Sequence, residues 1–139
     1  MPRLRNLAIA IAALLPAIVL VGCWGFVYEN RLVGKYGLVA VDIDEEMSVV
    51  EMLPSGDAIT LIGETVFAVG WNDEFIIAKQ HPYDEENWLV QRDITNFFIL
   101  SVLDGEVIGP LNESSFVSQR TQLGVPGSLE FTLIFRGLQ

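Results

Sequence analysis

The stretch that decides the fold is residues 67–80, Phe-Ala-Val-Gly-Trp-Asn-Asp-Glu-Phe-Ile-Ile-Ala-Lys-Gln. On both sides of Asn72-Asp73, large apolar side chains recur at every second position, which is the period of a β-strand and not of a helix. Asn and Asp favour turns, so the stretch predicts two antiparallel strands joined by a tight hairpin.

Further apolar runs, mostly of the same period, lie on both sides of this hairpin. They occupy residues 39–43, 47–53, 59–61, 88–92, 97–103 and 129–135. Pro54 to Asp57 is a turn by composition, and Asp104-Gly105 is a candidate type I′ turn. The connections are short, which favours antiparallel pairing. We therefore predict a mainly β (α+β) domain, an antiparallel meander that closes into a barrel or packs as a sandwich.

One helix is predicted, at about residues 112–123. Asn112 is a suitable N-cap, and Leu111 before it can pack on Phe116 as a hydrophobic staple. Gly124 suits the C-terminal cap, and Pro126 prevents continuation. The side chains expected to face the core are Phe116, Val117, Arg120 and Leu123.

The N-terminal 22 residues have the layout of a lipoprotein signal peptide. Arg3 and Arg5 form a short positive region, and residues 7–21 are uncharged and mainly apolar. Leu20-Val21-Gly22-Cys23 then reads as a lipobox and contains the single cysteine of the chain. The pattern predicts cleavage before Cys23 and attachment of diacylglycerol and a fatty acid such as palmitate to that residue. Several acyl chains anchor a protein stably in a membrane.

The alternative is an uncleaved membrane anchor over residues 7–28, which is long enough to span a bilayer. Trp24 and Tyr28 would then lie at the far interface. Either interpretation predicts a domain at the cell membrane or the outer membrane, facing the periplasm or the exterior. We expect a tether at residues 23–35 and one exported domain at residues 36–139.

The chain resembles small uncharacterised bacterial lipoproteins. The resemblance rests on the leader and lipobox, on residues 71–80, and on Gly109-Pro110-Leu111 ahead of the predicted helix. It implies export and a β-rich fold. It implies no activity and no catalytic residue.

Charge restricts the classes of partner. The chain has 18 acidic and 8 basic residues, and its formal net charge is −10. Every acidic residue follows Cys23 and two basic residues precede it, so the part after Cys23 carries −12. Such a charge opposes binding to nucleic acid and to anionic lipid headgroups, and it can steer a basic protein or peptide towards the domain.

Two acidic loops are the candidate sites for such a partner. Their members are Asp42, Asp44, Glu45 and Glu46 in the first loop, and Asp84, Glu85 and Glu86 in the second. The first loop lacks the glycine and the twelfth-position glutamate of a calcium-binding loop. We therefore expect no metal site, and the alternative for both loops is a purely solvated surface.

Little else in the sequence indicates chemistry. His81 is the sole histidine, and we expect it to lie in a solvated loop and not in a metal or acid–base site. Trp71 and Trp88 are expected in the core, the alternative being a stacking surface for a ligand. We predict no cofactor and no catalytic residue, and a non-enzymatic binding or inhibitory module. The alternatives are a structural or assembly accessory of the envelope, and a hydrolase that uses carboxylates.

Overall fold

The computed structural model describes residues 25–139. The predicted signal peptide at residues 1–22, Cys23, and most of the alternative anchor lie outside the described residues. Within residues 25–139, no helix has the length and apolar character needed to cross a membrane.

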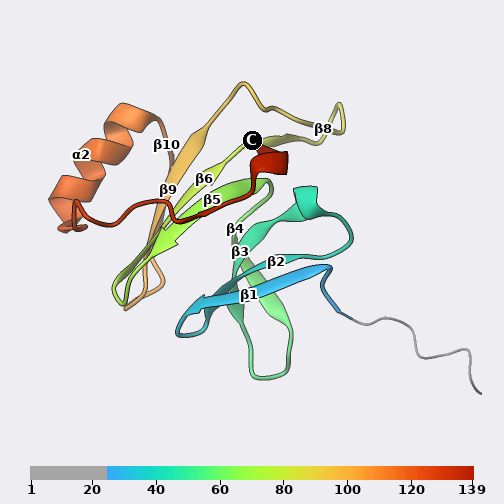
Figure 1. The fold of residues 1–139 in the computed structure, drawn as a ribbon, viewed down its shortest axis with the longest axis horizontal. Coiled ribbons are helices and arrows are strands. Elements are labelled where there is room, and N and C mark those ends of the chain that lie inside the picture. The colour runs from blue at the N-terminus through green and yellow to red at the C-terminus, as the bar shows by residue number, and fades with distance from the viewer. Residues whose placement is uncertain (1–24) are drawn as a thin grey trace, which may run out of the picture.

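Nearly all of the strands belong to two antiparallel sheets (Figure 1). The first sheet is a meander in which neighbouring strands are consecutive in the chain. Its strands are β1 (Tyr28–Val33), β2 (Tyr36–Ala40), β3 (Ser48–Met52) and β4 (Ala58–Ile62). A short 3-10 helix, η2 (Asp44–Glu46), connects β2 to β3.

The second sheet has the order β10-β9-β6-β5-β11. Its strands are β5 (Val66–Trp71), β6 (Phe75–Gln80), β9 (Asn96–Ser101), β10 (Val107–Leu111) and β11 (Leu133–Ile134). The hairpin predicted from residues 67–80 is confirmed as β5 and β6. The side-chain oxygen of Asn72 closes the turn by accepting from the amides of Glu74 and Phe75, both at 2.8 Å.

The remaining elements are a small hairpin, one α-helix and a C-terminal 3-10 helix. They are β7 (Tyr83–Asp84) with β8 (Leu89–Val90), α2 (Glu113–Leu123), and η3 (Arg136–Leu138).

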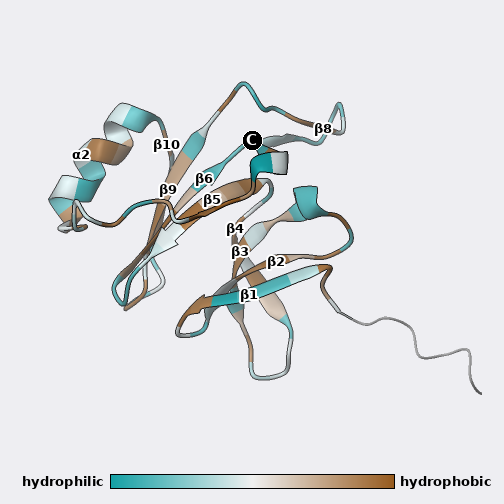
Figure 2. Cartoon of the chain, in the orientation of Figure 1, coloured by the Kyte–Doolittle hydropathy of each residue, from teal (hydrophilic) through white to brown (hydrophobic). Residues whose placement is uncertain are grey.

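The core has two parts, one on each face of the second sheet. Ile76 and Ala78 of β6 belong to the larger cluster, which also contains side chains of β2, β3 and β4. Ile77, on the opposite face of β6, packs with Phe116 of α2. The molecule is therefore a sandwich of two sheets with a helix on the outer face of the second, and not a closed barrel (Figures 1 and 2).

The predicted tether at residues 23–35 requires a correction, because most of it is strand β1. Residues 28–31 pair with residues 37–40 of β2, and Tyr28, Leu32 and Val33 pack against the larger cluster. Glu29 and Arg31 point outward. The charges of Glu29 and Arg31 resemble those of a linker in the sequence. In the structure these two side chains form the solvent face of an edge strand.

Two other strands have different limits from those predicted. We expected a half-exposed strand through residues 39–43, but β2 ends at Ala40, all five of its residues are buried, and Val41 and Ile43 are exposed. The predicted strand at residues 129–135 is paired as β11 at Leu133–Ile134 alone.

Helix α2 confirms the predicted caps but not the predicted stripe. The Asn112 side chain accepts from the Ser115 amide at 2.9 Å, and Gly124 has the left-handed conformation with φ of 71°. Leu111 packs against the cluster that contains Phe116. Phe116 is the single buried residue of the helix, whereas Val117 is 59 % exposed.

Candidate functional site

An open hollow lies where the chain enters β1, and we call it the acidic groove. Its volume is about 690 Å³. It is lined by Val27, Tyr28, Asp42, Ile43, Asp44, Glu45, Met47, Phe135, Arg136, Gly137 and Leu138. Three separate segments of the chain therefore meet in one site.

The floor of the acidic groove is apolar. Met47 and Leu138 are buried, with Met47 only 1 % exposed. Tyr28 and Phe135 are half-buried, and their rings meet edge to face with centroids 5.2 Å apart. Val27 and Ile43 stand at the margin and are 56 % and 55 % exposed.

Local hydrogen bonds hold the acidic wall of the groove. At the end of η2 the amide of Met47 donates to the carbonyl of Asp44 at 3.1 Å, and the Met47 side chain is buried. The buried Thr65 hydroxyl donates to the Glu45 carbonyl at 2.6 Å and ties η2 to the start of β5. The Asp42 amide donates to the Glu46 carboxylate at 2.8 Å. Glu46 therefore braces the loop, and it is not among the groove residues.

The other three acidic residues of this loop line the groove. Within residues 25–139, the carboxylates of Asp42, Asp44 and Glu45 make no ion pair and no hydrogen bond. Arg136 brings the single positive charge among the lining residues. The groove thus combines an apolar floor with a negative rim, a combination suited to a ligand that carries both apolar and basic groups.

The second predicted loop, Asp84 to Glu86, forms the tip of the β7–β8 hairpin. The Asp84 carboxylate accepts from the Asn87 side chain at 2.7 Å and from the amides of Asn87 and Glu86 at 3.2 and 3.0 Å. These bonds, that from the Asn87 side chain foremost, lower the pKa of Asp84. Asp84 therefore organises the turn, whereas Glu85 and Glu86 are exposed and available to a partner.

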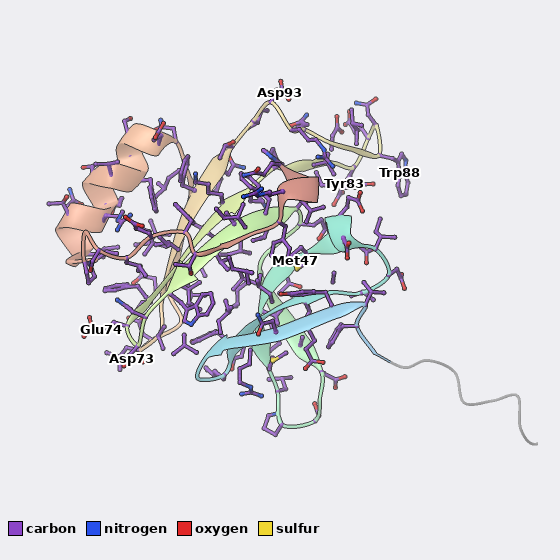
Figure 3. All side chains as sticks on the ribbon, in the orientation of Figure 1. Met47, Asp73, Glu74, Tyr83, Trp88 and Asp93 are labelled. Carbon is purple, nitrogen blue, oxygen red and sulfur yellow. The ribbon has the colours of Figure 1, made fainter. Side chains whose placement is uncertain are left out.

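Trp88 lies at the same tip and is not a core residue, contrary to the prediction. It has a φ of 55° and is 81 % exposed, and Figure 3 shows it pointing away from the body of the domain. Trp71, by contrast, packs against the larger apolar cluster as expected. Trp88 is therefore an exposed aromatic side chain close to the exposed Glu85 and Glu86.

The two acidic loops lie at the same end of the molecule without sharing a pocket. Thr65 connects them, since its hydroxyl holds the Glu45 carbonyl and its amide and carbonyl pair with His81 just before β7. Arg92, after β8, donates to the carbonyls of Gly137 at 3.2 Å and Gln139 at 2.8 Å beside the groove. Asp73 and Glu74 lie at the opposite end (Figure 3).

His81 is buried and not solvated, which corrects the prediction for its loop. It is 4 % exposed, its ring stacks on Phe67 at 4.1 Å, and its Nδ1 lies 2.7 Å from the Ile94 carbonyl. The ring is therefore part of the core. No group of three residues able to hold a metal ion occurs among residues 25–139.

Sequence reasoning missed the floor of the groove. The sequence predicts Tyr28 in the tether or the anchor, and Phe135 on the core face of a strand. Only the alternation of Tyr28 with the charged Glu29 and Arg31 hinted at a strand there. Nothing in the sequence indicated that Leu138, four residues after Ile134, would turn back under η2.

The fold defines a small two-sheet β domain with one covering helix and an acidic groove. Residues 33–135 match the model of the family described as protein of unknown function DUF3997, and the chain belongs to that family. No curated protein matches the chain. No solved structure matches it either.

Proposed function

We propose that this protein is a membrane-anchored envelope lipoprotein whose exported domain binds a basic protein or peptide without catalysing a reaction. The observation that carries the proposal is the acidic groove, where three carboxylates without partners in the described residues form one wall beside an apolar floor. The leader and the lipobox at residues 20–23 support the anchor.

A non-enzymatic role is supported by the state of the best candidate groups. The sole histidine, His81, is buried against Phe67 and held by the Ile94 carbonyl. Among the predicted site carboxylates, Asp84 is the nearest to His81 in sequence. Its carboxylate accepts hydrogen bonds from Glu86 and Asn87 within the hairpin turn. Neither group is placed to exchange a proton with a bound substrate.

The anchor is tested by replacing Cys23 with Ala in the full-length protein. We expect loss of lipid attachment and accumulation of the uncleaved precursor, because the thiol is the acceptor. Metabolic labelling with a fatty-acid analogue measures this, with Cys23→Ser as a second variant. Equal label on the parent and both variants rules out the lipoprotein and favours the uncleaved anchor.

The recognition step is tested with a lysine-rich peptide and two double variants of equal charge change. Asp42→Asn with Asp44→Asn, on the groove rim, should slow association. Asp73→Asn with Glu74→Gln, at the opposite end, should have little effect. Binding of the parent should weaken as salt shortens the Debye length from about 10 Å at 0.1 M to about 3 Å at 1 M. Equal effects of the two double variants would show that net charge acts and the groove does not.

A further inference from the structure

The position of the groove relative to the membrane follows from the few residues between Cys23 and the start of the folded domain. The Val27 amide already donates to the Val41 carbonyl at 3.3 Å, so the folded domain begins at residue 27. Four residue steps separate Cys23 from Val27, and an extended chain spans at most about 3.6 Å per residue. If Cys23 carries the lipid, Val27 lies within about 15 Å of the bilayer surface.

The acidic groove therefore belongs to the membrane-facing end of the domain. Val27 and Tyr28, the first residues after this short tether, are themselves part of its lining. The exposed Trp88 and Leu89 of the β7–β8 hairpin lie at the same end of the domain. Hydrogen bonds from Thr65, which pairs with His81 just before this hairpin, and from Arg92, which follows it, to the carbonyls of Glu45 and Gly137 link it to the groove. A ligand must reach this surface at, or close to, the bilayer.

The lining limits what such a ligand can be. Lipid headgroups of an anionic membrane would meet the carboxylates of Asp42, Asp44 and Glu45, which repel them. A hydrophilic basic segment would satisfy the carboxylates and leave the floor formed by Tyr28 and Phe135 in water. A peptide with one basic face and one apolar face satisfies both, and cationic amphipathic helices of this kind accumulate at membrane surfaces.

We propose that the acidic groove binds cationic amphipathic peptides at the surface of the membrane that carries the protein. The inference rests on the proposed function and names its class of ligand. The rim carboxylates pair with the basic face, and the apolar floor together with Val27 and Ile43 accepts the apolar face. Tethering raises the local concentration of the groove where such peptides gather, so a modest affinity suffices.

The test uses residues 23–139 coupled through Cys23 to maleimide lipid in neutral vesicles. This chain contains both apolar clusters and every pairing of the two sheets, and Cys23 is its single thiol. Two peptides of the same leucine and lysine composition are compared, one with the helical period and one with shuffled order. We expect the amphipathic peptide to bind at least about tenfold more tightly, by fluorescence anisotropy. We also expect the coupled protein to reduce dye leakage caused by that peptide.

Ile43→Ser should remove most of this preference, because Ile43 is an exposed apolar residue of the groove margin. Leu103→Ser is the matched control, since Leu103 is 94 % exposed but lies beside Asp73 and Glu74 at the other end. Loss of the preference in Ile43→Ser alone supports the inference.

Three results would overturn it, and they are distinguishable. Equal binding of both peptides would support recognition of basic partners in general and refute a preference for amphipathic ones. Binding of neither peptide refutes recognition of basic partners altogether. Binding of peptide-free vesicles by the uncoupled protein, abolished in Ile43→Ser, would assign the groove to lipid.

Discussion

At the scale of single residues, close approaches and local hydrogen bonds decide which side chains are permitted. A methyl group at Gly70 would collide with the Glu130 carbonyl, because the C-terminal segment crosses β5 at that point. A methyl group at Gly63 would meet nothing within 4 Å. Asp84 is restricted by hydrogen bonding and not by space. Its carboxylate accepts three hydrogen bonds that shape the tip of the β7–β8 hairpin.

The lowered pKa of Asp84 predicts a pH-dependent hairpin. Its contribution to the turn is fully present above the ordinary aspartate pKa of about 3.9 and is lost as the pH falls below that value through the lower pKa of the folded state. NMR chemical shifts of the Glu86 and Asn87 amides should therefore change in a step below about pH 4. Asp84→Asn keeps an acceptor and cannot titrate, so its amides should show no such step. Persistence of the step in that variant would assign it to another group.

At the scale of elements, helix α2 is attached to the second sheet through very few side chains. Phe116 stacks on Phe97 of β9 with ring centroids 4.9 Å apart. Arg120 lies over the Phe116 ring and donates to the carbonyls of Pro126 and Leu129 at 2.8 and 2.7 Å. The other two large apolar residues of the helix, Val117 and Leu123, are exposed. The caps at Asn112 and Gly124 define the two ends of the helix. Phe116, with Phe97 and Arg120 against its ring, attaches the helix to the sheet.

This attachment predicts a large difference between two adjacent substitutions. Phe116→Ala should lower the free energy of unfolding by about 3–5 kcal/mol, because it empties a fully buried site between helix and sheet. Val117→Ala should change it by less than about 0.5 kcal/mol, because Val117 is exposed and alanine is the better helix former. Chemical denaturation followed by circular dichroism measures both. Similar values for the two would mean that α2 does not dock as described.

At the scale of the whole molecule, the first strand joins the acidic groove to the two sheets. β1 covers the outer edge of β2 with a ladder from Tyr28 to Val33. Tyr28 also contacts Phe135 near the C-terminus, so the first and last segments of the domain meet. The described domain therefore begins at the acidic groove, and the first residues of this segment, Val27 and Tyr28, form part of its lining.

The role of β1 is tested by comparing chains that begin at residue 25 and at residue 36. We expect the longer chain to be a folded, mainly β monomer. The shorter chain should have a lower Tm and a tendency to associate, because it exposes the β2 edge and the apolar surface under Tyr28, Leu32 and Val33. Thermal melting and light scattering check this. Equal Tm values for the two chains would restore the boundary at residue 36 predicted from sequence.

The features that the sequence determined by itself are those set by neighbours along the chain. The β5–β6 hairpin follows from period-two alternation around Asn72-Asp73, and the ends of α2 follow from Asn112 and Gly124. One local rule failed. Asp104-Gly105 is not a type I′ turn, because that turn needs positive φ at both residues and Gly105 alone has it.

The tertiary structure alone decided the candidate site. The two acidic loops were visible in the sequence, but their different roles were not, since Asp42 and Asp44 line a groove whereas Asp84 holds a turn. The groove floor joins Tyr28 to Phe135, and their contact depends on how two sheets pack. Likewise, His81 was expected in solvent and is buried, whereas Trp88 was expected in the core and is exposed. Such contacts arise from the packing of distant segments, which no local period, cap or turn preference encodes.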